Sequence, residues 1–339
     1  MPRMDANLPK PPLHGVGPFS RSPEKAGDKG AAHCAEPHLQ CASRPAGRDR
    51  SEGLPHAARK PLLAPNPLPP AGEGAGTDPL MLYGETFASR LLLGTSRYPS
   101  PAVLQAAVQR AQPAMLTASL RREGAGSGER NGGRSFWQLL QTLGVPVLPN
   151  TAGCHSADEV FTTAQMAREV FATTWIKLEL IGDDYSLQPD TLNLVEAARR
   201  LVRDGFKVLP YCTEDLVLCQ RLVDAGCEAV MPWAAPIGTG KGPVNPYAMR
   251  LLRERLNVPL IVDAGLGLPS HACQVMEWGY DGVLLNTAVA LAQDPVAMAG
   301  AFADAVRAGR SAFLAGAMRE QHAAQPSTPV LGTPFWHET

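Results

Sequence analysis

The sequence is poor in several features that mark particular classes of protein. Only 6% of its 339 residues are aromatic, and no stretch approaches 18 consecutive apolar residues. The first absence predicts a core of aliphatic side chains, and the second predicts that no helix spans a bilayer. The formal net charge is −1, so no excess of charge favours binding to nucleic acid or to an anionic membrane.

Paired metal or disulfide motifs are also missing. The seven cysteines are odd in number and show no C-x-x-C spacing. This pattern argues against a disulfide framework or a zinc module and favours a reducing compartment, so we expect a cytoplasmic protein. His155 and His271 have no partner at ligand spacing, and we therefore expect no metal site and no cofactor.

The first 79 residues differ in composition from the rest. They hold 15 of the 32 prolines, a single aromatic residue and no isoleucine. Such a segment buries too little apolar surface to offset the entropy of ordering, so we predict a disordered, Pro/Gly/Ala-rich and dispensable extension over 1–79. It lacks the apolar segment of a signal peptide, and its acidic residues argue against a transit peptide. A second interpretation is that translation begins at Met81.

Residues 80–339 alternate short aliphatic runs with amphipathic segments, which predicts an α/β fold. Strands are expected at 91–93, 114–119, 145–149, 175–180, 207–212, 229–233, 259–264 and 282–286. Helices are expected at 100–111, 135–143, 156–172, 189–203, 214–225, 245–256, 269–278 and 294–308. Eight such units in this length favour a (β/α)₈ TIM barrel of parallel strands. The alternative is a doubly wound open sheet, but no G-x-G-x-x-G follows the first strand.

The fourth expected strand carries two charged residues on one face. Lys177 and Glu179 alternate with apolar neighbours, so they should point into the barrel. Residues 80–339 hold 18 arginines but only three lysines, and arginine cannot lose its proton. An interior lysine here indicates an amine that forms a Schiff base with a carbonyl substrate. The alternative is an ion pair that only packs the barrel. Lys207, at a strand start, is expected to be solvated.

The expected seventh and eighth strands end in groups suited to an anionic ligand. Asp263 closes the seventh strand and is a candidate acid or base, with a turn-forming role as the alternative. The glycine loop around 264–267, together with Asn286 and Thr287, lies where many barrels bind a phosphate, and the glycine loop around 235–242, after the sixth strand, lies on the same rim. These loops favour a sugar-phosphate ligand, which Lys241 could also contact.

These residues resemble the ThiG family of thiazole synthases over about 80–335. The resemblance rests on six segments in order: 148–153 (LPNTAG), 175–179 (WIKLE), 208–212 (VLPYC), 235–238 (APIG), 262–272 (VDAGLGLPSHA) and 285–288 (LNTA). It implies a (β/α)₈ barrel that makes the thiazole phosphate of thiamine. The implied reactants are 1-deoxy-D-xylulose 5-phosphate, dehydroglycine and sulfur from a thiocarboxylated, ubiquitin-like carrier protein.

The resemblance also implies roles for single residues. The Schiff-base lysine falls on Lys177, and the acid–base carboxylates fall on Glu179 and Asp263. The sugar-phosphate contacts fall on Gly238, Ala264, Gly265, Asn286 and Thr287, and a family pair of arginines matches Arg121 and Arg122. The implied partners are the carrier, an enzyme that supplies dehydroglycine, and further copies of the chain in a homo-oligomer, a tetramer.

Two other functions fit the residues taken alone. One is a different Schiff-base barrel, such as a sugar-phosphate aldolase, which needs no sulfur carrier. The other is a barrel that binds the ligand without turning it over, and such a protein would form no imine with Lys177. Residues 1–79 have no counterpart in the family, which favours the interpretation that Met81 is the start.

Overall fold

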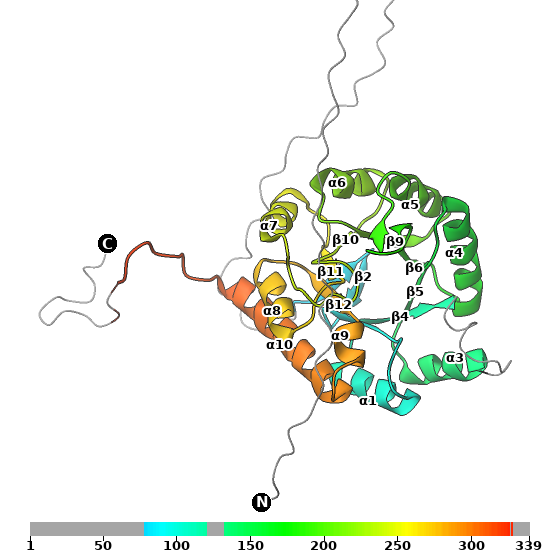
Figure 1. The fold of residues 1–339 in the computed structure, drawn as a ribbon, viewed down its shortest axis with the longest axis horizontal. Coiled ribbons are helices and arrows are strands. Elements are labelled where there is room, and N and C mark those ends of the chain that lie inside the picture. Colours follow the sequence, from blue (N-terminus) through cyan, green and yellow to red (C-terminus); the bar gives the residue numbers. More distant parts are fainter. Residues whose placement is uncertain (1–77, 121–131, 326, 328–339) are drawn as a thin grey trace, which may run out of the picture. The chain divides into compact units, whose positions relative to one another are not determined.

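Eight parallel strands form a barrel in the computed structural model, which describes residues 78–120, 132–325 and 327. The sheet order is β10-β9-β6-β5-β4-β3-β12-β11, and a parallel bridge between Val230 and Leu260 joins its two ends. The predicted (β/α)₈ barrel is confirmed (Figure 1). The strands are β3 (Leu91–Gly94), β4 (Met115–Ser119), β5 (Val147–Asn150), β6 (Trp175–Leu178), β9 (Lys207–Cys212), β10 (Met231–Pro232), β11 (Ile261–Asp263) and β12 (Gly282–Leu285).

Helices surround this ring of strands, as Figure 1 shows in a view down the barrel. The helices are α1 (Pro101–Ala111), α3 (Gly132–Leu143), α4 (Ala157–Phe171), α5 (Leu194–Arg203), α6 (Leu216–Asp224), α7 (Pro246–Arg255), α8 (Pro269–Glu277), α9 (Thr287–Ala290) and α10 (Pro295–Ala315). Among the described residues, no helix is both long and apolar enough to cross a membrane.

Side-chain caps set most helix starts. The Ser156 hydroxyl accepts from the Glu159 amide, and the Asp294 carboxylate accepts from the first amides of α10, so these predicted starts are confirmed. The predicted start at 189 is wrong. Asp190 accepts from the Leu192 and Asn193 amides and forms a turn, and α5 begins only at Leu194.

The amino-terminal half of the barrel interior is apolar. Each strand contributes one buried side chain to a single cluster: Leu92, Met115, Leu148, Trp175, Leu209, Met231, Ile261 and Leu284. This layer fills the barrel as alternation along a strand requires, and it leaves the carboxyl half for polar side chains.

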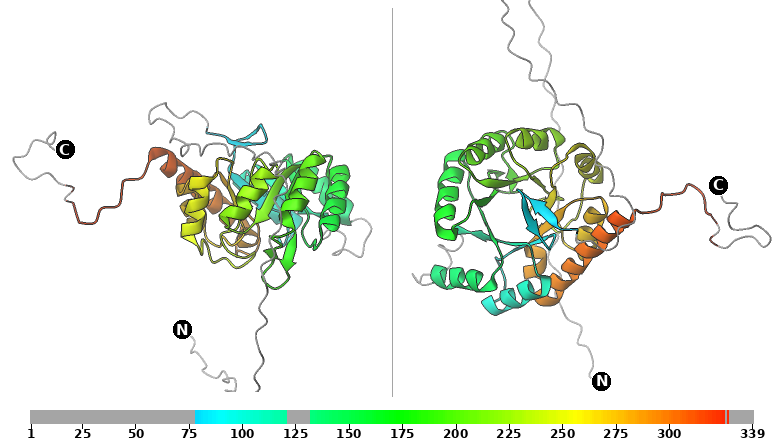
Figure 2. Two further views of the ribbon diagram at one scale, coloured as in Figure 1. Left: turned by 90° about the horizontal axis from the view of Figure 1, so that it is seen from above. Right: turned by 180° about the vertical axis from the view of Figure 1, so that it is seen from behind.

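A hairpin that the sequence reading missed closes the amino-terminal end of the barrel. Strands β1 (Leu80–Leu82) and β2 (Glu85–Phe87) pair antiparallel around Tyr83 and Gly84, which both have positive φ. Its side chains Leu80, Leu82 and Phe87 join the apolar layer, and Figure 2 (right) shows the hairpin in cyan across the opening. Lys207 pairs with Glu85 and lies 5.0 Å from the Trp175 ring centroid, and its side chain stays partly exposed at this end of the barrel.

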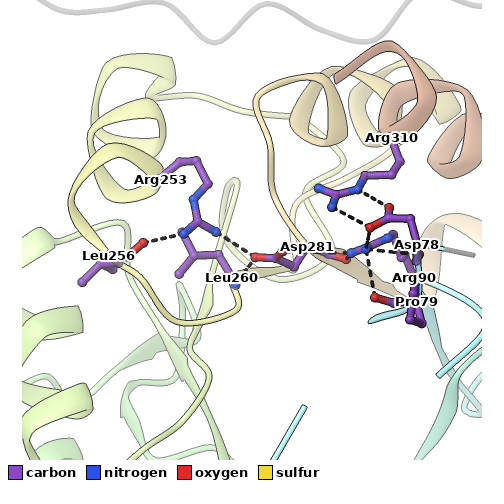
Figure 3. A network of polar contacts seen from close by, with 8 residues as sticks. All are labelled: Asp78, Pro79, Arg90, Arg253, Leu256, Leu260, Asp281 and Arg310. Atoms are coloured by element: carbon purple, nitrogen blue, oxygen red, sulfur yellow. Dashed lines mark hydrogen bonds and ion pairs between the residues drawn. The ribbon is translucent and has the colours of Figure 1, made fainter. Parts of the chain in front are cut away.

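An ionic network ties the start of the described chain to the last helix (Figure 3). Asp78 accepts from the Arg310 Nε at 2.7 Å and from an Arg90 guanidinium nitrogen at 2.9 Å. Arg90 also donates to the Asp281 carbonyl at 2.8 Å, and Asp281 pairs with Arg253 at 2.7 Å. Apart from Asp78 and Pro79, the predicted extension 1–79 lies outside the described residues.

Candidate active site

Strand β6 presents alternate side chains to two different environments. Ile176, Leu178 and Leu180 pack in the core between strands and helices. Lys177 and Glu179 point into the barrel, where 6% and 7% of their surfaces are exposed. The predicted orientation of this strand is therefore confirmed.

The Thr151 hydroxyl fixes the backbone at Glu179, one residue past the end of β6. It donates to the Glu179 carbonyl at 2.7 Å and accepts from the Glu179 amide at 2.8 Å. Strands β5 and β6 pair over a short stretch, in which Asn150 lies opposite Lys177. The Thr151 side chain thus forms the hydrogen bonds that the Glu179 amide and carbonyl would otherwise make with a longer neighbouring strand.

The lysine lies between two buried carboxylates. Its Nζ is 2.6 Å from Asp263 Oδ2 and 3.1 Å from Glu179 Oε1. Asp263 is 3% exposed and comes from β11. The sequence could place Lys177 and Glu179 on one face of a strand, but only closure of the barrel brings Asp263 to the same amine.

Burial and charge act against each other in this cluster. Burial lowers the pKa of the Lys177 amine, but the carboxylates of Asp263 and Glu179 outweigh burial and hold that pKa above its ordinary value. Burial raises the pKa of Asp263, and the Lys177 ammonium opposes this rise without cancelling it. The amine is therefore an ammonium group at neutral pH, and the best-placed acceptor for its proton is a carboxylate with raised proton affinity.

A cavity of about 1200 Å³ opens above the cluster, at the carboxyl ends of the strands. Lys177, Glu179 and Asp263 line it, and so do all five residues predicted to bind the sugar phosphate: Gly238, Ala264, Gly265, Asn286 and Thr287. The fold thus brings these eight predicted residues to one cavity, while their individual roles stay predictions. Lys241 is exposed and does not line it.

Two positions show how closely the backbones pack around the cavity. Gly265 has φ +80, and a Cβ added there would lie 2.3 Å from the Ala235 nitrogen. Ala264 adopts φ +72, which is uncommon for a residue with a side chain. The loop after β11 therefore lies directly against the loop after β10, and there is no room for a side chain at position 265.

Several cavity residues escaped the sequence analysis. Thr117, Asn150 and Arg97 line the cavity from β4, from β5 and from the loop after β3. Thr117 and Asn150 are polar residues at or near the end of an expected strand, which is a signal that could have found them. Arg121 and Arg122 lie outside the described residues. Within the described ranges, no group of three His, Cys, Asp or Glu side chains could hold a metal ion.

A second hairpin borders the cavity at its outer rim. Strands β7 (Ile181–Asp183) and β8 (Gln188–Pro189) follow β6 directly, and Leu187 between them lines the cavity. The Tyr211 hydroxyl donates to the Leu187 carbonyl at 3.4 Å, and Lys177 Nζ lies 5.7 Å from the Tyr211 ring centroid. Figure 2 (left) shows this hairpin in green at the opposite end of the barrel from the cyan one.

His271 borders the same rim. Its Nδ1 accepts from the Gly267 amide at 3.2 Å. It thereby holds the glycine loop that follows β11.

The fold and the site define a class of enzyme. This is a TIM barrel whose carboxyl-end cavity contains a buried lysine held between two carboxylates, a set of groups that can serve amine and acid–base chemistry. The family model for the thiazole biosynthesis protein ThiG matches residues 81–329. The chain therefore belongs to the ThiG family of thiazole synthases, which are sulfur-transferring enzymes of thiamine biosynthesis.

Similar proteins agree with this assignment. The chain is 80% identical over 260 residues to a thiazole synthase of Variovorax paradoxus (strain S110), covering 77% of this chain and 95% of the relative. It is 81% identical over 263 residues to one of Paracidovorax citrulli (strain AAC00-1), covering 78% and 97%. The crystal structure of the Amycolatopsis orientalis BexX/CysO complex aligns with a TM-score of 0.65 and 28% identity, covering 72% of this chain and 99% of that one.

Proposed function

We propose that the enzyme makes the thiazole phosphate through an imine between Lys177 and the ketone of 1-deoxy-D-xylulose 5-phosphate. The observation that carries this proposal is the position of the Lys177 amine, which is buried, lines the cavity and lies within 3.1 Å of two carboxylates. The amine attacks the ketone carbon, and loss of water gives the imine. The imine then acidifies the C–H bond on the neighbouring sugar carbon.

The two carboxylates divide the proton steps. Lys177 must lose a proton before it attacks, and Asp263 at 2.6 Å accepts it because burial has raised the pKa of that carboxyl. Glu179 then removes the C–H proton from the carbon beside the imine, which gives an enaminol, and returns it to the former imine carbon. The freed carboxylate accepts the proton of the neighbouring hydroxyl, so that carbon becomes the carbonyl and Lys177 stays attached to the sugar as an amine. No outside base is needed, since each transfer is between groups of the cavity.

The sulfur and nitrogen come from two further reactants in this proposal. A thiocarboxylated carrier protein delivers sulfur to the shifted carbonyl carbon, and dehydroglycine closes the ring. The similar BexX chain was crystallised in complex with CysO, which supports a sulfur carrier as the partner. We place the carrier's C-terminal tail at the carboxyl rim, because the cavity opens there.

The proposal extends to assembly and location. We infer that the enzyme is a homo-oligomer in the cytoplasm, and the free cysteines of the described residues are compatible with a reducing compartment. Light scattering at micromolar concentration should give a multiple of the chain mass, and a strict monomer would contradict the oligomer. Crosslinks from the carrier tail should reach the carboxyl rim, and crosslinks to the hairpin β1–β2 would contradict the docking side.

Reconstitution tests the proposed reaction. Purified enzyme with the sugar phosphate, dehydroglycine and thiocarboxylated carrier should release the thiazole phosphate, detected by mass spectrometry. Omission of any one reactant should abolish the product. Cleavage of the sugar phosphate in the absence of carrier would instead support an aldolase, and the absence of any turnover with all reactants present would support a binding protein.

A further inference from the structure

Arg97 occupies an unusual position in the loop after β3. Its φ is +72, in the left-handed region that residues with side chains rarely adopt. Such backbone persists where the surroundings hold it, and it concentrates at functional sites. Arg97 also lines the cavity that contains Lys177.

Neighbouring strands hold the two residues that precede Arg97. The Thr95 hydroxyl donates to the Thr117 carbonyl at 2.7 Å, and the Asn286 amide donates to the Ser96 hydroxyl at 2.7 Å. These contacts anchor the loop on β4 and β12, so the strained backbone at Arg97 is fixed from both sides. Strand β12 pairs with β3 in parallel, which places this loop beside the loop that carries Asn286 and Thr287.

The guanidinium itself has no partner. Unlike Arg90 and Arg310, which are ion-paired, Arg97 makes no hydrogen bond or ion pair with other residues in the described part of the chain. The positive φ of Arg97 is therefore not explained by a contact between its side chain and the rest of the described chain. The residue is exposed and lines the cavity, so its guanidinium is available to a ligand.

The other charges of the cavity indicate a role for the Arg97 guanidinium. Among the described residues, the charged lining of the cavity consists of Arg97, Lys177, Glu179 and Asp263. Without Arg97 the cluster carries one net negative charge, which repels an anionic substrate. Arg97 balances that charge at the corner where Asn286 and Thr287 lie.

We propose that Arg97 is a substrate-binding residue that pairs with the phosphate of the sugar phosphate. A guanidinium matches the planar spacing of two phosphate oxygens and binds them with two hydrogen bonds. This inference rests on the proposed function, since it assumes a phosphorylated substrate. The other anions of the reaction are the thiocarboxylate of the carrier and the carboxylate of dehydroglycine, and the experiment separates them from the phosphate.

The test compares Arg97→Ala with Lys241→Ala, a control that removes the same charge from the same rim outside the cavity. Arg97→Ala should raise KM for the sugar phosphate at least tenfold, as expected for loss of charge-assisted hydrogen bonds. Its kcat should stay within about threefold of the parent's, because Arg97 does not contact the reacting carbonyl. Arg97→Lys should give an intermediate KM, and Lys241→Ala should leave both constants unchanged.

One further variant and one binding probe separate effects on folding from effects on function. Arg97→Gly removes the charge and suits the positive φ, so it should show the same KM defect with a melting temperature no lower than that of Arg97→Ala. Calorimetry with inorganic phosphate alone should show at least tenfold weaker binding to Arg97→Ala than to the parent and to Lys241→Ala. This readout holds even if the parent forms no imine with the sugar phosphate, which would contradict the proposed function only.

The inference is overturned if phosphate affinity and the KM for the sugar phosphate are the same in Arg97→Ala, Arg97→Gly and the parent. It is also overturned if the defect appears only in the KM for the thiocarboxylated carrier or only in the KM for dehydroglycine, which would assign Arg97 to that reactant.

Discussion

Lys177 Nζ lies 2.6 Å from Asp263 Oδ2 although two strands, β9 and β10, separate β6 from β11 in the sheet. Asp263→Asn keeps the shape of the side chain and removes the proton acceptor. We expect kcat to fall by about 10²- to 10⁴-fold, as for loss of a general base. Single-turnover measurement of imine formation should show the defect before any sulfur is added, and normal imine formation would contradict the role given to Asp263.

Stability should respond differently from activity at the same position. The parent cluster has two carboxylates and one ammonium, so Asp263→Asn leaves a balanced Lys177–Glu179 pair. The melting temperature of this variant should equal or exceed the parent's, because one buried charge has been removed without leaving another unpaired. A fall of several degrees would show that Asp263 is needed for folding, and the kinetic comparison would then lose its basis.

Glu179 offers the second carboxylate test. Glu179→Gln should allow imine formation, since Asp263 still accepts the lysine proton, but it should block the carbonyl shift. Exchange of the sugar C–H hydrogen with deuterated solvent, followed by mass spectrometry, measures that step directly. Exchange at the parent's rate in Glu179→Gln would assign the proton transfer to another group.

Thr151 supports Glu179 without lining the cavity. Thr151→Val keeps the shape but leaves the Glu179 amide and carbonyl unsatisfied, at a cost of about 1–3 kcal/mol for a buried group. Thermal unfolding should show the loss, and turnover should fall because the carboxylate is no longer fixed. Thr151→Ser retains the hydroxyl and is the control, expected to stay close to the parent in both measurements.

The Asp78 network gives a stability prediction with a defined pH dependence. Hydrogen bonding to Arg310, aided by the charges of Arg90 and Arg310, holds the pKa of Asp78 below its ordinary value. A lowered pKa stabilises the fold above the unfolded value of about 3.9, and this contribution disappears as pH falls through the folded pKa. Asp78→Asn should cost about 1 kcal/mol at pH 7, a figure reduced for solvent screening of a partly exposed carboxylate, and nothing once the pH is below the folded pKa of Asp78.

Two truncated variants test where the folded chain begins. A variant starting at Asp78 should match the full chain in melting temperature and turnover. A variant starting at Met81 loses the Asp78 ion pairs and Leu80, which is 1% exposed, and should be less stable by about 2–3 kcal/mol. Equal melting temperatures for the two variants would contradict the contribution assigned to Asp78 and Leu80.

The sequence predicted the barrel because its strands and helices alternate with a strong period. Residues 175–180 show the limit of that reading: alternation placed Lys177 and Glu179 correctly, but the strand ends at Leu178 because Thr151 takes over the pairing. Local periodicity carries no information about such a long-range side-chain contact.

The missed elements share a physical reason. The hairpin β1–β2 has strands of three residues, too short to show a period, and it is stabilised by packing into the barrel. Nothing in the sequence singled out Arg97, because its interest lies in a positive φ angle and in a cavity that distant strands form. Asp190 resembled a helix cap since a turn and a cap use the same carboxylate-to-amide bonds.

The central claim is that Lys177 forms the imine, and reductive trapping tests it most directly. Parent enzyme, Lys177→Arg and Lys177→Ala are incubated with 1-deoxy-D-xylulose 5-phosphate and borohydride, and the adduct is located by peptide mapping. The parent should carry one sugar adduct, on Lys177, whereas both variants should carry none and make no thiazole, because arginine cannot present a neutral amine. An adduct on Lys207 or Lys241, or full turnover by Lys177→Arg, would contradict the claim.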